Sequence, residues 1–181
     1  MTKLSTLAEA VASIPGGAHV ALSGFAISRS AMAFAHEVIR QGITGLTVSQ
    51  CVAAMDADIL AGGQAVERIV YGGGSRGRFG QHHCLNRGIE EGTIAAEEYS
   101  SLSMAFRYLA GSLGLPFIPI RSLRGSDILT RLQEVAPSEI AFVDVPFTGD
   151  DWVVLKPLAP DVAVVQVHTA DEDGNAWIMG A

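Results

Sequence analysis

One turn within residues 19–34, which read HVALSGFAISRSAMAF, has residue types that could bind an anion. A short apolar run leads into Ser23-Gly24-Phe25, and helical spacing follows, with Ser28 or Ser30 as the candidate helix cap. Glycine permits a positive φ and the close approach of a ligand. Free N–H groups at a helix start favour an anion or a developing oxyanion. From the spacing alone, a plain strand-to-helix turn is the favoured interpretation, and the residues match neither a dinucleotide nor a nucleotide-triphosphate loop.

A second candidate site is the loop YGGGSRGRFGQHH at residues 71–83. Its glycines, among them Gly73 and Gly74, follow an expected strand and would let the backbone approach a ligand closely. Arg76, Arg78 and the two histidines could bind a phosphate or a carboxylate, although the composition is also typical of a solvated surface loop. Because adjacent histidines cannot easily share one metal ion, we predict no metal site.

A third candidate is the carboxylate pair Glu97-Glu98, which precedes a helix expected over residues 99–113. A carboxylate at a helix start often only compensates the helix dipole. In a pocket it would instead act as a base or position a substrate. Both interpretations stay open from the residues alone. The acidic segment 171–175, by contrast, reads Asp-Glu-Asp-Gly-Asn and is typical of a tight turn between two strands rather than of a calcium loop.

The elements that must position these residues alternate between short apolar runs and helical spacing. Such alternation predicts an α/β fold with an open, mostly parallel sheet and helices on both faces. We expect a single domain over residues 1–181, since no flexible linker divides the chain. The expected helices lie near residues 4–14, 32–39, 85–91 and 99–113, and the expected strands near 19–25, 46–53, 68–71, 139–147 and 162–170.

Composition excludes several classes of partner. A formal net charge of −7 argues against nucleic acid, because affinity for phosphate backbones comes mainly from lysine and arginine. The sequence contains no run of about 18 apolar residues, so we predict no membrane span. Two cysteines make no disulfide framework, so a reduced, cytoplasmic setting is expected. With 49% hydrophobic residues, the chain is expected to bury an apolar patch in an oligomer.

Four segments, taken in order, resemble the alpha subunit of the family I CoA-transferases. The similarity is greatest to the glutaconate CoA-transferase branch, together with the steroid-ring-cleaving CoA hydrolase subunits that resemble it. The segments are LSGFAISRSAMAFAHEVIRQGITGLTV, AGGQAVERIVYGGGSRGRFG, GIEEGTIAAEEYSSLSMAFRYLAGSLGLPFIPIRSLRGSDI and VHTADEDGNAWIMG. The sequence AISRSA, where 3-ketoacid-type transferases carry a glycine-rich turn with proline, favours the glutaconate-like branch.

The resemblance implies a function and a partner. A beta subunit would supply the glutamate that attacks an acyl-CoA and forms a glutamyl-CoA thioester, with the CoA thioester as substrate and no separate cofactor. Ser23, Gly24 and Phe25 would shape the acyl pocket, and Gly73 and Gly74 would also contact substrate. Glu98 matches the catalytic glutamate of the hydrolase-like alpha subunits, with Glu97 as the alternative register.

Three functions are therefore weighed. The first is a CoA-transferase subunit that acts on acyl-CoA and carboxylic acid substrates. The second is a subunit of a CoA-thioester hydrolase that opens a ring, and the third is a non-catalytic remnant that binds a partner or a small ligand. The chain stops at Gly180-Ala181, where relatives continue for several more elements, so we expect either a fragment truncated at its C-terminus or a shortened homologue.

Overall fold

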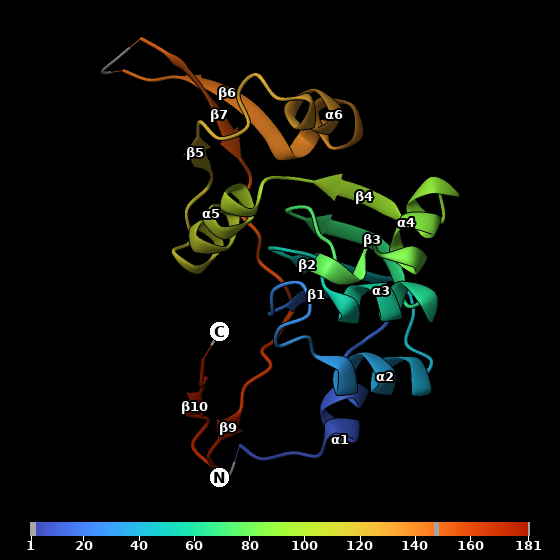
Figure 1. Ribbon diagram of the computed structural model, residues 1–181. Coiled ribbons are helices and arrows are strands. Elements are labelled where there is room, and N and C mark those ends of the chain that lie inside the picture. The colour runs from blue at the N-terminus through green and yellow to red at the C-terminus, as the bar shows by residue number, and fades with distance from the viewer. Residues whose placement is uncertain (1–2, 147–148, 181) are drawn as a thin grey trace.

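The computed structural model describes residues 3–146 and 149–180, and its centre is a five-stranded parallel sheet with the strand order β4-β3-β2-β1-β8 (Figure 1). The sheet confirms the predicted α/β class. Its strands are β1 (His19–Leu22), β2 (Leu46–Gln50), β3 (Val66–Tyr71), β4 (Ala95–Glu98) and β8 (Val162–Val164).

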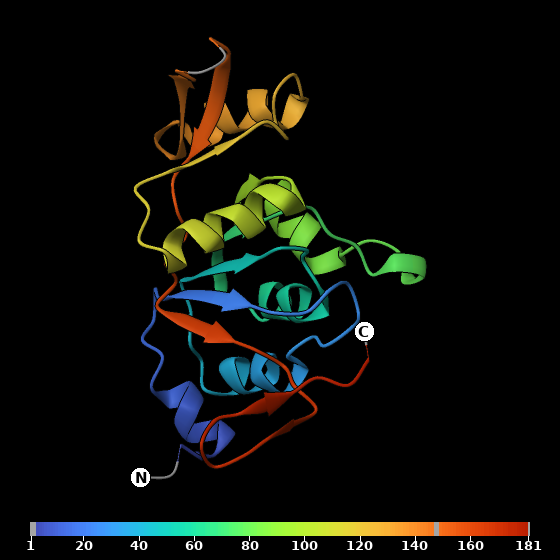
Figure 2. The ribbon, with the colours of Figure 1, turned by 90° about the vertical axis from the view of Figure 1, so that its left-hand side faces the viewer.

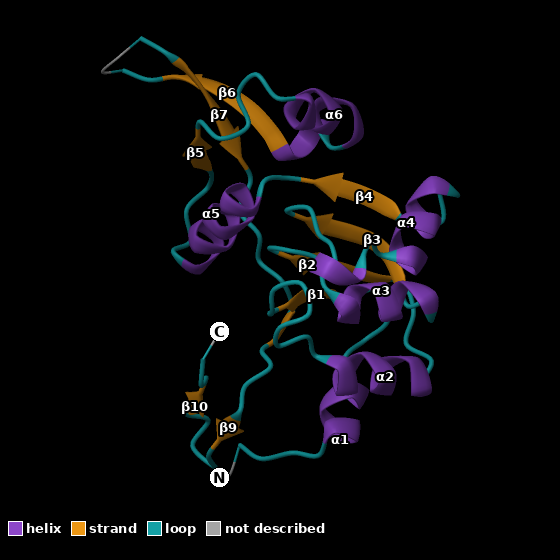
Figure 3. Ribbon diagram, in the orientation of Figure 1, coloured by secondary structure: helices purple, strands orange, loops and turns teal. Residues whose placement is uncertain are grey.

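Helices lie on both faces of this sheet, as the sequence predicts (Figure 3). One face is covered by four helices: α1 (Leu7–Ala12), α2 (Met32–Arg40), α3 (Met55–Gly62) and α4 (His83–Glu90). The other face carries α5 (Ser101–Ser112). Within the described residues, no helix is both long and apolar enough to cross a membrane.

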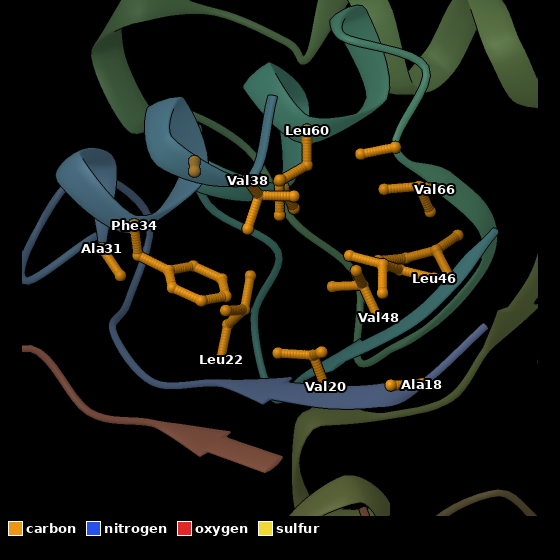
Figure 4. Close-up of a cluster of buried hydrophobic side chains, with 14 of the residues drawn as sticks. Ala18, Val20, Leu22, Ala31, Phe34, Val38, Leu46, Val48, Leu60 and Val66 are labelled. Carbon is orange, nitrogen blue, oxygen red and sulfur yellow. The ribbon is translucent and has the colours of Figure 1, made fainter. Parts of the chain in front are cut away.

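The main core lies between the sheet and the four-helix layer (Figure 4). Burial alternates along β1, so that Val20 and Leu22 point toward α2 while their neighbours face α5. Phe34 and Val38 of α2 meet these strand residues from above the sheet. Burying each such side chain contributes about 1.5–3 kcal/mol, so this alternation fixes which face α2 covers.

A hydrogen-bond chain marks the opposite face, beneath α5. Tyr108 of α5 donates to Ser49 Oγ over 2.7 Å, and Ser49 Oγ lies 2.7 Å from His19 Nε2. With Tyr108 donating, the Ser49 hydroxyl is free to donate to a neutral His19 ring. Burial lowers the pKa of His19, against an opposing effect of the Asp161 carboxylate. The folded chain therefore favours the neutral form of His19.

This burial predicts a pH-dependent stability. Because the pKa of His19 is lower in the folded chain, protonation favours unfolding. The contribution is complete above the unfolded pKa of about 6.5 and is lost as the pH falls through the lower folded value. We expect His19→Gln to flatten the loss of the free energy of unfolding between pH 7.5 and 5, measured by urea titration. The matched variant at the exposed His36, His36→Gln, should keep the wild-type slope, and equal slopes in both variants would contradict the assignment.

A smaller antiparallel sheet packs beyond β4, at the top of Figure 1. Its strand order is β5-β7-β6, with β5 (Ile118–Ile120), β6 (Ile140–Asp144) and β7 (Asp151–Leu155), and α6 (Asp127–Val135) covers it. The strand expected over residues 139–147 is thus β6, although residue 147 of the expected range lies outside the described residues. It pairs antiparallel in this second sheet, not in the main one.

The C-terminal part contains the predicted turn. The strand expected over residues 162–170 ends at Val164, and a short ladder of β9 (Thr169–Ala170) and β10 (Ala176–Trp177) follows. Between them, Asp171 Oδ1 accepts the N–H groups of Asp173 and Asn175 at 3.0 and 2.9 Å. The remaining short elements are two 3₁₀ turns, η1 (Gly77–Phe79) and η2 (Pro137–Glu139).

Candidate active site

The candidate site is the edge of the five-stranded sheet at which its parallel strands end, here called the carboxyl edge. In open α/β sheets, ligands bind at this edge. Ser23 follows β1, Cys51 follows β2, Gly72 follows β3, and Glu98 is the last residue of β4. The sequence-predicted site residues therefore share one edge, as parallel pairing requires.

Gly24 adopts a conformation that other residues rarely take. Its φ is +99°, and a Cβ there would lie 2.7 Å from the carbonyl oxygen of Arg29. The turn that follows is closed by Phe25 and Ser28, whose backbones exchange hydrogen bonds of 2.9 and 2.8 Å. Ala26 and Arg29 also have φ of +54°, so the turn holds strained backbone. Glycine is required at position 24 by geometry, independently of any ligand.

Two expectations about this turn are corrected by the structure. The helix after it begins at Met32 with Ala31 as its N-cap, so neither Ser28 nor Ser30 caps it. Ser30 Oγ instead donates to Ala26 O. The Ala31 N–H, which the sequence left free for a ligand anion, donates to the buried carboxylate of Asp56 over 2.8 Å. The carboxylate of Asp56 therefore already accepts the backbone N–H at this helix start that a ligand anion would otherwise bind.

The glycines after β3 bring the second loop against the segment that follows β2. A Cβ on Gly74 would lie 2.7 Å from both the Cβ and the carbonyl oxygen of Ala53, and Gly73 O accepts the Ala53 N–H over 2.9 Å. Gly73 has φ +79°, and a Cβ there would meet Glu98 Oε1 at 3.6 Å. Of the two predicted glycines, Gly73 is thus a direct neighbour of Glu98, and Gly74 packs against Ala53.

The structure separates the roles of the two adjacent glutamates. Glu97 is buried, and its carboxylate accepts from Arg68 Nη1 at 2.7 Å and from the Tyr99 hydroxyl at 3.1 Å. Glu98 is exposed and lies beside Gly73. The N-cap of α5 is Ser100, whose hydroxyl accepts from the Ser103 N–H, so Glu98 does not cap the helix. Of the two, Glu98 is free to meet a substrate.

The candidate site residues lie at two separate places along the carboxyl edge. Glu98 and the Gly24 turn follow strands that are three positions apart in the sheet. At a spacing of about 4.8 Å per strand, roughly 14 Å separate them. The structure therefore places Glu98 beside Gly73, with Gly74 next in the chain, but not beside Ser23, Gly24 and Phe25. A ligand that contacts both groups must therefore be long.

The basic and histidine side chains of the 71–83 loop do not converge on a site. Arg76 donates to the carbonyl oxygen of Gln81 within the loop, which projects from the sheet in Figure 2. His82 is buried, and its Nε2 lies 3.1 Å from Ala53 O. Across the described ranges, no group of three or more His, Cys, Asp or Glu side chains could hold a metal ion.

Two further groups at the edge are held in their neutral forms. Burial raises the pKa of the Cys51 thiol, so it is not a thiolate at neutral pH. Burial, and then the charge of Glu98, raises the pKa of Tyr71 to about 12. Tyr71 pairs with Glu98 in the β3–β4 register and keeps its hydroxyl proton for donation.

The sequence reasoning missed the buried polar groups Gln50 and Asp56, both fully excluded from solvent. Their only sequence signal is polarity at positions where an apolar side chain fits the surrounding pattern.

The matches to known proteins fit this geometry. Residues 4–181 match the family model described as Coenzyme A transferase. The chain belongs to the coenzyme A transferase family. It is 34% identical over 184 residues to one of the subunits of 3-oxoadipate CoA-transferase from Pseudomonas knackmussii, covering 99% of this chain and 63% of the relative.

Two solved structures have the same fold. Glutaconate CoA-transferase from Acidaminococcus fermentans matches with a TM-score of 0.90 and 29% identity, over 99% of this chain and 61% of that one. A cysteine-to-serine variant of the decarboxylase AibA/AibB matches with a TM-score of 0.86 and 35% identity, over 98% and 67%. The chain thus spans about three fifths of the length of the transferase subunits that it matches.

Proposed function

We propose that this chain is the alpha-type subunit of a CoA-transferase that moves CoA between carboxylic acids. The observation that carries the proposal is the exposed Glu98 beside Gly73 on the carboxyl edge, in a chain of the coenzyme A transferase family. Family membership supports the chemistry of a CoA thioester. The carboxyl edge supplies the carboxylate of Glu98, the backbone of Gly73 and the Gly24 turn, all at the ends of parallel strands.

In this proposal the chain forms one wall of the site, and a partner chain forms the other. The partner supplies the nucleophilic glutamate, which accepts CoA from the donor thioester and passes it to the acceptor acid. The Pseudomonas relative is named as one subunit of its enzyme, which supports an enzyme of more than one kind of chain. The Gly24 turn borders the acyl group, while Glu98 and the protonated Tyr71 orient the reacting end.

The test is co-expression of the chain with the product of the adjacent gene. The purified complex is incubated with a panel of acyl-CoA esters, each with and without an acceptor carboxylate. Formation of the new acyl-CoA only when acceptor is present supports the transferase. Release of free CoA without acceptor identifies a hydrolase, and a complex inert toward the whole panel leaves the non-catalytic interpretation as the answer.

The same complex tests the turn. Gly24→Val is expected to abolish turnover, because the new side chain would lie 2.7 Å from Arg29 O at a φ that costs roughly 1–3 kcal/mol for other residues. Gly17→Val is the matched control, since Gly17 also has a positive φ, of +81°, with nothing within 4 Å of its Cβ position. Turnover and melting temperature are measured for both. Full activity of a folded Gly24→Val complex would make the turn merely structural.

A further inference from the structure

The turn over residues 23–31 has little packing of its own. Phe25 and Ile27 at its tip are 62% and 45% exposed. Its internal hydrogen bonds include the Phe25–Ser28 pair and the contact of Ser30 with Ala26. Because the tip does not enter the core, the position of the turn depends on how its two ends are held.

Gln50 and Asp56 bind the two ends of this turn, at Ser23 and at Ala31. Gln50 is the last residue of β2, and its Nε2 donates to Ser23 O over 2.8 Å. Its Oε1 accepts the Ala54 N–H over 3.0 Å. Asp56, in the first turn of α3, accepts the Ala31 N–H over 2.8 Å, and Gln50 Nε2 also donates to it over 3.3 Å. The pair therefore joins the start and the end of the turn to the neighbouring strand end.

The chemistry calls for a carboxylate at position 56. Three donors converge on its two oxygens: the N–H groups of Ala31 and Ala57, and Gln50 Nε2. An asparagine amide would turn an N–H₂ group toward at least one of these donors. Leaving a buried donor unpaired is unfavourable, so the asparagine variant is expected to loosen the end of the turn at Ala31. Burial raises the pKa of Asp56, and the three hydrogen bonds oppose that rise.

We propose that Gln50 and Asp56 are positioning residues for the acyl-binding turn, acting through the backbone of Ser23 and Ala31. This inference rests on the proposed function, which places the turn beside the acyl group. Displacing a substrate-binding element by about 1 Å can cost a hundredfold in rate, so a hydrogen-bonded frame at both ends of an exposed turn has a direct effect on turnover.

Asp58 provides a matched control on the same helix. It is also buried, and its Oδ1 accepts two backbone N–H groups, those of Cys84 and Leu85, at 2.8 and 2.9 Å. These bonds hold the start of α4 rather than the turn. Asp56→Asn and Asp58→Asn make the same chemical change two residues apart, with different structural targets.

The experiment compares both variants in the complex with the partner chain, by hydrogen exchange and by steady-state kinetics. For Asp56→Asn we expect at least tenfold faster exchange in residues 23–31, and a kcat roughly tenfold lower with a smaller change in the KM of the acyl-CoA. For Asp58→Asn we expect faster exchange in residues 83–90 and an unchanged kcat. Gln50→Met removes the bond to Ser23 O without changing charge and leaves the bonds of Ser23 with Val164 and Gln166 in place, and it should reproduce the Asp56→Asn pattern.

The outcomes separate this inference from the function on which it rests. A wild-type complex without acyl-CoA turnover defeats the proposed function, while the exchange data still report whether the two residues hold the turn. If Asp56→Asn leaves exchange in residues 23–31 unchanged, the positioning role is overturned. Faster exchange in residues 23–31 with a wild-type kcat overturns it as well. Failure of both Asp56→Asn and Gln50→Met to fold also overturns it, because the residues would then support the whole core.

Discussion

Glu98→Gln is expected to lower the turnover of the assembled complex by roughly a hundredfold or more while the chain stays folded. The structure gives the reason: the Glu98 side chain is exposed at the carboxyl edge, 3.6 Å from where a side chain on Gly73 would begin. Removing its charge leaves the neighbouring ion pair intact, since Arg68 pairs with Glu97. Turnover and melting temperature are measured on the same preparation.

Two controls make this result specific. Glu97→Gln should lower the free energy of unfolding by about 1–2 kcal/mol, because it weakens the bond of a buried carboxylate to the half-exposed, charged Arg68. Glu91→Gln removes an exposed carboxylate at the C-cap of α4, the opposite edge of the sheet, and should leave turnover unchanged. If Glu98→Gln turns over normally, the catalytic assignment on this chain is wrong, and the chemistry lies wholly on the partner.

Part of the carboxyl edge was predictable from the sequence, because the apolar runs that indicate strands also indicate that the strands pair in parallel. Apolar runs that alternate with helical spacing predict parallel strands, and parallel strands place their carboxyl ends together. This is why the Gly24 turn and the Gly73 loop, which each follow an expected strand, belong at one edge, whereas the place of Glu98 at the same edge comes from the structure alone. The distance of roughly 14 Å between its ends could not be predicted, because it depends on the strand order.

The choice between Glu97 and Glu98 depended on tertiary contacts. Both precede α5 and both are carboxylates, so local sequence gives no preference. The structure separates them because β4 is a strand, and neighbouring residues of a strand point to opposite faces. That strand, AAEE, has no β-branched or aromatic residue and was not predicted. Its pairing with β3 overrides its propensity.

The buried groups were missed for a related reason. Polar residues such as Gln50 and Asp56 are buried only where several hydrogen-bonding partners meet them. The converging groups come from separate segments of the chain, so no short window of sequence shows them. Of the β5-β7-β6 sheet, only β6 falls on an expected strand; β7 also pairs with β5, which lies well before it in the chain, so no short window of sequence shows that pairing.

Arg107→Met is expected to cause the largest loss of stability, about 3–5 kcal/mol, because it breaks a buried charged contact between α5 and the smaller sheet. Arg107 is 1% exposed, and its Nη2 donates to Glu139 Oε2 over 2.6 Å while its Nε donates to Lys156 O over 2.7 Å. The guanidinium also lies 4.4 Å from the centre of the Tyr99 ring, which in turn bonds to Glu97.

The loss should fall toward the lower end of that range, because Glu139 keeps a second partner. Lys156 Nζ lies 3.1 Å from Glu139 Oε1, and the Glu139 side chain is 20% exposed. The matched control is Arg131→Met, which removes a pair with Glu134 whose side chains are 71% and 62% exposed. Such a surface pair contributes at most about 1 kcal/mol. Urea unfolding measures both variants, and equal losses would mean that Arg107 does not join α5 to the smaller sheet.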